Sequence, residues 1–264
     1  MPGAGRYPDS VGVDVIRTHA AGLAALGRRH DLTTPVPTCG DWDLADLLWH
    51  LAEVHDLWHH VIVHRPAGPD DYEQPDRPPV TELADLLDDR CAALTVVLAA
   101  ADPAERAWSW ADEQTVGFTL RRQSHEALIH HLDGLLAVGA RVPDVAPALA
   151  ADGVDELIDV MLTGVPDWAD YERTAGTVLL RATDTADEWA LAYGRMTGTS
   201  PHTGTTYDLV AMEVLPEVTD PDTEIAGAAF ELDRWLWGRG GAVTVRGNRA
   251  DPDRLRSVIV ESTA

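Results

Sequence analysis

Hydrophobic residues in the first half of the chain recur at the three- and four-residue spacing of amphipathic helices. Four such helices are predicted, at about residues 9–29, 43–64, 81–102 and 116–138, and the loops between them are rich in proline, glycine and charge. Asp41 or Asp43 is suited to cap the second helix, and Thr81 the third. Four helices of this length joined by loops predict a helical bundle. A fifth helix is expected at about 146–162.

Beyond residue 165 the hydrophobic pattern changes. Residues 176–183, 188–196 and 206–215 alternate between apolar and polar side chains, as strands do. A helix is expected at 226–241, a last strand at 242–248 and a last helix at 251–262. The predicted class is therefore α+β, with a helical bundle over residues 1–165 and a small α/β domain over residues 174–264.

Composition restricts the classes of function. The chain has 264 residues, 45% of them hydrophobic, and a formal net charge of -24. Nucleic acid is not an expected partner, because phosphate contacts need clustered Lys and Arg. No lysine is present, which excludes Schiff-base chemistry. The sequence has no apolar run long enough to span a membrane and no signal-like N-terminus, so a cytoplasmic protein without a membrane partner is expected, and its oligomeric state stays open.

Several common catalytic motifs are absent from the sequence, among them the nucleophile elbow, the Walker A loop and the dinucleotide-binding glycine motif. Cys39 and Cys91 lack the CxxC spacing of metal or redox sites and are expected to be ordinary thiols. The tryptophans are expected to pack between helices, because large aromatic side chains dominate protein cores. Ten of the eleven histidines lie between His19 and His131, so any imidazole-based site is expected in the N-terminal half.

The segment HEALIH, residues 125–130, is a candidate metal site, although it is one residue longer than the HExxH of zinc proteases. Side chains four residues apart share a helix face, so Glu126 and His130 can reach one point. His125 is less suited, because it lies about 100° round the helix from Glu126. The alternative interpretation is an ordinary polar pair on a solvated helix face.

A third ligand is needed for a zinc site, and the second helix is the obvious donor. On its helical wheel His50 lies beside the apolar face, whereas His55 and His59 turn away and are expected to face solvent. His50, Glu126 and His130 would form a two-histidine, one-carboxylate site with an open position. A hydrogen-bonded core histidine is the alternative interpretation of His50.

Two further polar residues of the fourth helix are candidates for supporting roles. Asp133 lies on the same side as His130 and is suited to orient its imidazole or to act as a further ligand, although a surface carboxylate is the favoured interpretation. Arg122 is a candidate to bind a carboxylate of a thiol cofactor or of a substrate, with a surface salt bridge as the alternative.

The resemblance to a known family rests on three N-terminal segments, TPVPTCGDWDLADLLWHLAEVH, VGFTLRRQSHEALIHHLDGLLAVG and ADGVDELIDVML. They resemble the DinB-like, mycothiol-dependent maleylpyruvate isomerase family of actinobacteria. The segment TEIAGAAFELDRWLWGR is similar to the C-terminal domain of that family, which resembles sterol carrier proteins.

The resemblance implies a DinB-like four-helix bundle followed by a sterol-carrier-like domain. It implies a divalent metal, commonly zinc, held by His50, Glu126 and His130, with the thiol of mycothiol at the open position. It also implies that Arg239 is a catalytic residue that faces the pocket and holds an anionic substrate; a surface arginine after a helix end is the alternative for Arg239.

Together these features predict a metal-dependent thiol S-transferase that joins mycothiol, or a related low-molecular-weight thiol, to an electrophilic small molecule. A divalent cation would remove the thiol proton and leave the nucleophilic thiolate. One alternative is a mycothiol-dependent cis–trans isomerase of the maleylpyruvate type, in which the thiolate adds reversibly to a double bond. Another is a non-catalytic metabolite- or lipid-binding protein built on the C-terminal domain.

Overall fold

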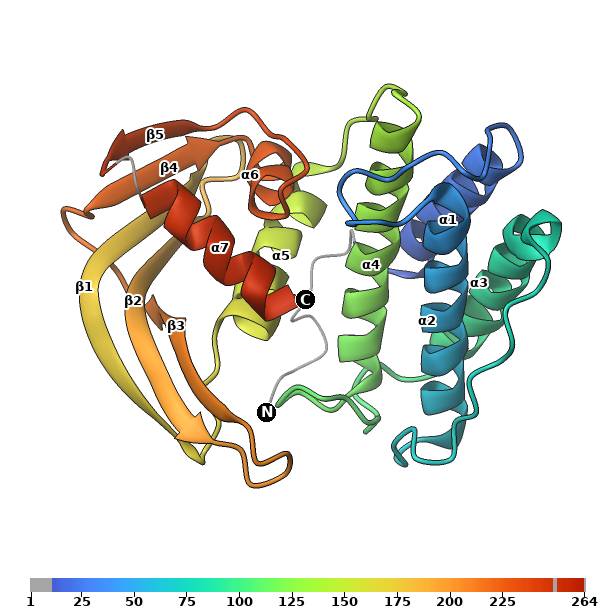
Figure 1. Ribbon diagram of the computed structural model, residues 1–264, viewed down its shortest axis with the longest axis horizontal. Helices are drawn as coiled ribbons and strands as arrows, with labels where there is room; N and C mark the ends of the chain where they lie inside the picture. Colours follow the sequence, from blue (N-terminus) through green and yellow to red (C-terminus); the bar gives the residue numbers. More distant parts are fainter. Residues whose placement is uncertain (1–10, 249–250, 264) are drawn as a thin grey trace. The chain divides into compact units, whose positions relative to one another are not determined.

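The computed structural model describes residues 11–248 and 251–263, with side chains described as far as residue 260. The chain divides into two compact units, Met1–Asp144 and Val145–Ala264. The first unit is helical and the second combines a sheet with helices (Figure 1). This arrangement confirms the α+β class predicted from the sequence.

The first unit is a bundle of four helices, α1 (Val13–Gly27), α2 (Leu44–His64), α3 (Leu83–Ala100) and α4 (Val116–Ala137) (Figure 1). Its core is made of apolar side chains from all four helices, among them Ile16, Leu51, Leu87 and Leu128. The four predicted helices are present, and the expected start of the first one at Asp9 lies outside the described residues.

Side-chain caps define the N-termini of α2 and α4. The side chain of Asp43 accepts a hydrogen bond from the backbone N–H of Asp46, and the side chain of Asp46 accepts one from the N–H of Asp43, so the two caps are reciprocal. The hydroxyl of Thr115 accepts from the N–H of Phe118 and caps α4. Thr81 does not cap α3, because it lies within a short 3₁₀ turn, η1 (Val80–Glu82), that precedes the helix.

α2 and α4 run in opposite directions (Figure 1). His50, in the second turn of α2, contacts Glu126 in the middle of α4. Trp58, later in α2, lies beside Phe118 at the start of α4, with ring centroids 6.3 Å apart. Both contacts fit one antiparallel register of α2 and α4. In this register His50 lies opposite Glu126.

The second unit is a five-stranded sheet with helices on one side (Figure 1). The strand order is β3-β2-β1-β4-β5; β1 pairs with β4 in parallel, and the other neighbours are antiparallel. The strands are β1 (Ala169–Ala182), β2 (Glu188–Thr199), β3 (Thr206–Leu215), β4 (Thr223–Gly227) and β5 (Thr244–Gly247). The helical segments are α5 (Pro147–Glu156), the π-helical η2 (Leu157–Leu162), α6 (Ala229–Leu236) and α7 (Asp251–Thr263).

The helix α5 is part of the core of the second unit. Its buried residues Ala150 and Val154 belong to one hydrophobic cluster with Leu180 of β1 and Leu232 of α6. The boundary between the units, after Asp144, therefore differs from the expected division into residues 1–165 and 174–264. An amphipathic pattern predicts that a helix buries one face but does not identify the surface it packs against.

The strand β4 is absent from the sequence-based prediction. It has only five residues, with the sequence TEIAG, and too few apolar side chains to show an alternating pattern. It nevertheless pairs with both β1 and β5. The expected helix at 226–241 is shorter than predicted, because Gly227 ends the strand and α6 stops before Gly238, whose φ of 72° is typical of a glycine that follows a helix.

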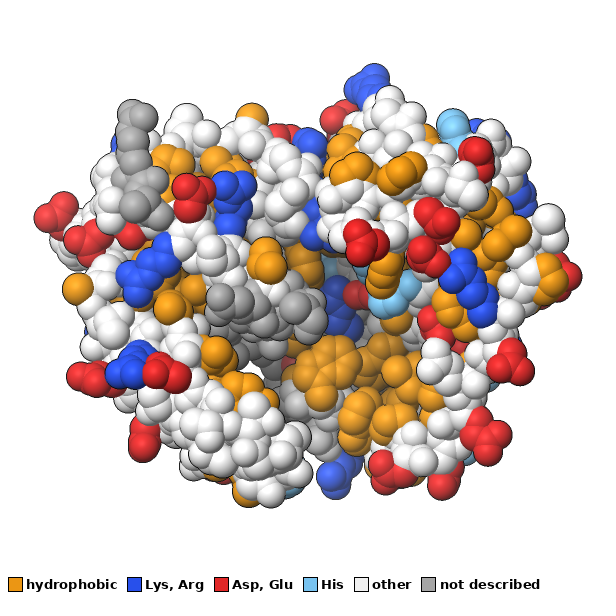
Figure 2. Space-filling model, viewed as in Figure 1, with side chains coloured by type: hydrophobic (Ala, Val, Ile, Leu, Met, Phe, Trp, Pro, Cys, Tyr) orange, Lys and Arg blue, Asp and Glu red, His pale blue; other side chains and the backbone are white. Residues whose placement is uncertain are grey.

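The surface reflects the acidic composition of the chain. Figure 2 shows carboxylate side chains spread over the visible face rather than gathered in one patch. Across the ranges that the structure describes, no helix combines the length and the hydropathy needed to cross a bilayer.

Candidate metal centre

Three side chains of α2 and α4 meet at one point. Nε2 of His50 lies 3.2 Å from Oε1 of Glu126, and Nε2 of His130 lies 3.1 Å from the same oxygen. One ligand atom from each residue lies within 4.8 Å of the others. The i,i+4 spacing places Glu126 and His130 on one face of α4, and His50 reaches them from the antiparallel helix. We call these three residues the ligand cluster.

The ligand cluster is open to solvent on the side of His50. The exposed fractions of the three side chains are 31% for His50, 19% for Glu126 and 13% for His130. Trp42, in the loop before α2, partly covers the cluster, with its ring centroid 4.8 Å from that of His50 and 6.4 Å from that of His130. A small ligand therefore has access to the cluster beside an aromatic wall.

The carboxylate of Asp133 fixes the orientation of His130. Nδ1 of His130 lies 3.1 Å from Oδ2 of Asp133, which leaves Nε2 directed toward Glu126. Asp133 has no exposed surface and also accepts hydrogen bonds from the hydroxyl of Thr38 at 2.6 Å and from the thiol of Cys39 at 3.4 Å. The expectation of a surface carboxylate was wrong. A buried carboxylate that holds the outer nitrogen of a histidine is a common support for a metal ligand.

Cys39 and Thr38 were not identified as site residues from the sequence. They lie in the loop between α1 and α2, and no periodic pattern places a loop residue against a helix. Cys39, His130 and Asp133 form a second group of potential ligand atoms within 4.8 Å of one another. This group shares His130 with the ligand cluster, so the two are parts of one polar centre.

Arg122 is buried and binds Glu126. Its side chain is 3% exposed, and Nη2 lies 3.0 Å from Oε2 of Glu126, the oxygen that the two histidines do not contact. A surface salt bridge, the alternative interpretation of Arg122, is therefore wrong. The guanidinium fixes the carboxylate so that Oε1 faces the imidazoles. Binding of a thiol or substrate carboxylate by Arg122 stays a prediction.

The ligand cluster keeps its carboxyl group ionised. Burial alone would raise the pKa of Glu126, but the charge and hydrogen bonds of His130, the hydrogen bond of His50 and the charge of Arg122 together hold that pKa well below its usual range. For His130 the directions are reversed. Burial alone would lower its pKa, but the charge of Glu126 and the hydrogen bond of Asp133 outweigh burial and raise the pKa well above its ordinary value. A cation bound to the cluster would take the place of the imidazole proton.

His55 is buried, although the sequence suggested that it faces solvent. Its exposed fraction is 0%, and neither ring nitrogen has a hydrogen-bond partner among the described residues. Burial lowers its pKa to about 4, so the ring is neutral at pH 7. The hydrophobic pattern of the helix predicts one buried face, whereas α2 packs against both α3 and α4 and buries a second stripe that includes Leu48, Ala52 and His55.

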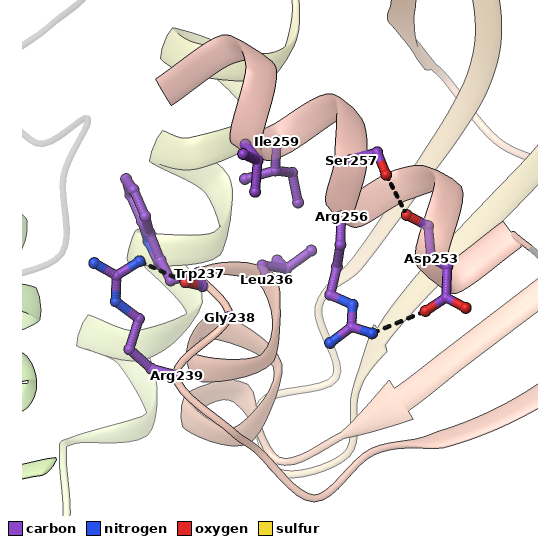
Figure 3. Close-up of a pocket in the computed structure, with 9 residues that line it drawn as sticks. Leu236, Trp237, Gly238, Arg239, Asp253, Arg256, Ser257 and Ile259 are labelled. Atoms are coloured by element: carbon purple, nitrogen blue, oxygen red, sulfur yellow. Dashed lines mark hydrogen bonds and ion pairs between the residues drawn. The ribbon is translucent and has the colours of Figure 1, made fainter. Parts of the chain in front are cut away.

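Arg239 belongs to the second unit, just after α6. Its Nη1 donates to the carbonyl oxygen of Trp237 at 2.5 Å, and its guanidinium carbon lies 5.6 Å from the centroid of the Trp237 ring. Together with Leu236, Arg256 and Ile259 it lines an open cavity of about 570 Å³ (Figure 3). The side chain thus lies at a cavity of its own unit, and its role as a catalytic residue stays a prediction.

Comparison with known proteins addresses the N-terminal unit directly. Residues 14–133 match the family model described as the mycothiol maleylpyruvate isomerase N-terminal domain. The matched residues lie within the first unit and make up less than half of the chain. The resemblance proposed from the sequence segments is thereby confirmed, and it covers the whole of the ligand cluster. No curated sequence matches the chain.

The fold is similar to that of a solved enzyme over most of the chain. The crystal structure of the mycothiol-dependent maleylpyruvate isomerase has a TM-score of 0.58 and 14% sequence identity, with coverage of 88% of this chain and 90% of that chain. A histidine-to-alanine mutant of the mycothiol-dependent maleylpyruvate isomerase gives a TM-score of 0.57 at 13% identity and the same coverage. At these identities the similarity shows the fold, which includes both the helical bundle and the sheet unit.

Proposed function

We propose that this protein is a metal-dependent enzyme that uses mycothiol as a co-substrate and isomerises a small unsaturated acid of the maleylpyruvate type. The observation that carries the proposal is the ligand cluster, two imidazoles and one carboxylate from α2 and α4. The family assignment of residues 14–133 and the fold shared with a mycothiol-dependent isomerase support it.

The residues of the ligand cluster fit a divalent cation such as zinc. His50, Glu126 and His130 supply nitrogen and oxygen donors of the kind found in catalytic zinc sites, which keep a further position for a ligand. A divalent cation held by these residues would supply a Lewis acid that lowers the pKa of a thiol, so that a thiolate would be present at neutral pH. One carboxylate and two neutral imidazoles would leave such a site with a net positive charge, which would favour an anionic sulfur.

The surrounding residues keep the donors in place. Asp133 holds the outer nitrogen of His130, and Arg122 holds the outer oxygen of Glu126. Both supports are buried, so water does not compete for their hydrogen bonds. Arg239 is proposed to bind the carboxylate of the substrate, because a guanidinium matches a carboxylate with two parallel hydrogen bonds.

In the proposed isomerisation the thiolate sulfur adds to one carbon of the cis double bond, and the π electron pair moves onto the conjugated carbonyl. The former double bond is then single and rotates. The electron pair returns, the carbon–sulfur bond breaks and the thiolate leaves with its electrons, so no proton or oxidant is consumed. The S-transferase expected from the sequence uses the same thiolate but retains the carbon–sulfur bond. The relatives support isomerisation rather than transfer.

The deciding experiment combines zinc-loaded protein, mycothiol and maleylpyruvate, with analysis by mass spectrometry and proton NMR. Isomerisation predicts a product of unchanged mass with a trans double bond, formed only when mycothiol is present. A stable thiol adduct would identify a transferase instead. A Glu126→Gln variant, which loses one donor charge, serves as the matched inactive control. No turnover, together with no bound metal in the purified protein, would favour the non-catalytic binding protein.

A further inference from the structure

The cavity at the end of α6 contains side chains that the proposed function does not use (Figure 3). It is lined by residues 236–239 and by one face of α7 between Asp253 and Val260, all of them in the second unit. Its volume of about 570 Å³ is typical of a site for a small organic ligand. We call this space the α6–α7 cavity.

One part of the α6–α7 cavity is apolar. Leu236 and Ile259 line it, and each is 2% exposed and belongs to the hydrophobic core of the second unit. Trp237 and Val260 extend this wall, and Val260 is 66% exposed, so the wall continues to the surface of the protein. Because core packing holds Leu236 and Ile259 in place, the apolar part of a ligand has a preformed surface to contact.

Arg256 supplies a cationic group whose donors are only partly used. Its Nη2 donates to Oδ1 of Asp253 at 2.9 Å, one turn earlier on α7. Its guanidinium carbon lies 5.4 Å from the centroid of the Trp235 ring, a contact that favours one orientation of the side chain. Nε and Nη1 donate to no residue that the structure describes. A guanidinium has five N–H donors, so a second carboxylate can bind beside Asp253.

The charges of the lining residues favour an anion of low charge. Figure 3 shows Arg256 and Arg239 on opposite sides of Leu236, and Asp253 is the acidic residue among those that line the cavity. Cationic groups therefore exceed anionic ones at the cavity. The chain as a whole carries a net charge of -24, and its repulsion of a ligand grows with the negative charge of that ligand. A monocarboxylate is thus favoured over a doubly charged phosphate ester.

We propose that the α6–α7 cavity binds a monocarboxylic acid with an apolar body. The carboxylate accepts hydrogen bonds from Arg256, and the apolar body lies against Leu236, Trp237 and Ile259. A neutral molecule would lose the charged hydrogen bonds, and a small anion without an apolar body would leave the apolar wall in water. The inference goes beyond the proposed function, because this site requires neither a metal ion nor a thiol.

The test uses isothermal titration calorimetry on the full-length protein without thiol. 4-Phenylbutyrate carries an apolar body and a carboxylate, 4-phenylbutan-1-ol carries the same body without charge, and butyrate carries the charge without the ring. Each titration is run on zinc-loaded protein and repeated after removal of the metal with a chelator, because a carboxylate also binds metal ions. A site in the α6–α7 cavity gives the same affinity in both forms.

Two variants remove the anchor of the carboxylate and one serves as a control. Arg256→Gln removes the charge. Val260→Asp places a carboxylate four residues from Arg256 on the same helix face, where it competes for the guanidinium. Both side chains are exposed, so both variants should fold, and circular dichroism checks this. Arg246→Gln, at an arginine of β5 that is 81% exposed and does not line the cavity, is the matched control.

We expect 4-phenylbutyrate to bind the wild-type protein at least about 10-fold more tightly than either of the other probes, the effect of one charged hydrogen bond. Arg256→Gln and Val260→Asp should lower its affinity to that of the alcohol, whereas Arg246→Gln should retain it. Equal affinities for acid and alcohol, wild-type affinity in Arg256→Gln, or binding that disappears with the metal overturns the proposal. Each of these results leaves the thiol-dependent isomerisation to its own experiment.

Discussion

The buried carboxylate of Asp133 and the partly buried imidazole of His130 form a pair in which Oδ2 lies 3.1 Å from Nδ1. The pair leaves the opposite nitrogen of His130 directed at Glu126, where the ligand cluster needs it. The orientation of a proposed metal ligand is thus set by a residue that does not itself belong to the cluster.

Replacement of Asp133 by Asn should weaken metal binding. The amide keeps the shape of the side chain but removes the charge that fixes the imidazole, so we expect the zinc affinity to fall by about 10- to 100-fold. Competition with a coloured chelator measures this affinity. Asp112→Asn, at an exposed carboxylate, is the matched control and should leave the affinity unchanged. Equal affinities for Asp133→Asn and the wild-type protein would show that Asp133 has no role in holding the ligand.

Arg122→Gln should destabilise the fold far more than the loss of a surface arginine. The substitution removes the buried guanidinium that pairs with Oε2 of Glu126, and we expect the free energy of unfolding to fall by about 3 kcal/mol. Arg77→Gln breaks the more exposed pair with Asp46 and should cost less than about 1 kcal/mol. Urea unfolding of the two variants in metal-free buffer provides the comparison, and similar losses for both would contradict a structural role for Arg122.

His55→Leu should stabilise the protein. Both ring nitrogens of His55 are buried without hydrogen-bond partners among the described residues, and a leucine of similar volume removes that penalty. We expect the free energy of unfolding to rise by about 1–3 kcal/mol. His30→Leu, at an exposed position, should have little effect. A lower melting temperature for His55→Leu would mean that the imidazole makes a favourable interaction in solution.

Acid should destabilise the protein through His19 and His131. Their Nδ1 atoms lie 3.1 Å apart between α1 and α4; burial first, and then the charge of His131, lowers the pKa of His19 to about 4. Because the folded pKa is below the unfolded value near 6.5, the unfolded chain binds more protons. Stability should therefore be lost as the pH falls from about 6.5 toward 4.

The variant His19→Gln isolates that contribution. Glutamine does not titrate in this range and can still donate a hydrogen bond to His131. Urea midpoints measured at pH 7 and pH 5 should differ less for His19→Gln than for the wild-type protein. An identical pH dependence in the two proteins would assign the acid sensitivity to other groups.

The sequence predicted the ligand cluster because its geometry is local. Glu126 and His130 are four residues apart on one helix, and the apolar face of α2 indicated His50 as the histidine able to join them. The helices were predicted for the same reason, since their hydrophobic period is repeated over several turns. Contacts within one helix depend on the spacing of residues along the chain, and this spacing can be read from the sequence.

Features that depend on tertiary packing were missed or misassigned. Asp133 and His55 were expected to face solvent, but both are fully buried. A helical wheel shows which side of a helix is most apolar, but it does not show that neighbouring helices also cover other sides of α2 and α4. Thr38 and Cys39 come from a loop, and their contact with Asp133 depends on how that loop folds back. The helix α5 was assigned to the bundle, whereas it packs in the core of the second unit. Its sequence shows that one face is buried but does not show which elements that face packs against.

If His50, Glu126 and His130 together hold one metal ion, a His50→Ala variant should lose it, and its metal content is therefore the measurement to make. His59→Ala, at a histidine later on the same helix and outside the ligand cluster, is the control. All three proteins are dialysed against zinc, desalted and analysed by elemental mass spectrometry. We expect one zinc per chain in the wild-type protein and in His59→Ala, and none in His50→Ala. Stoichiometric zinc in His50→Ala, or none in the wild-type protein, would contradict it.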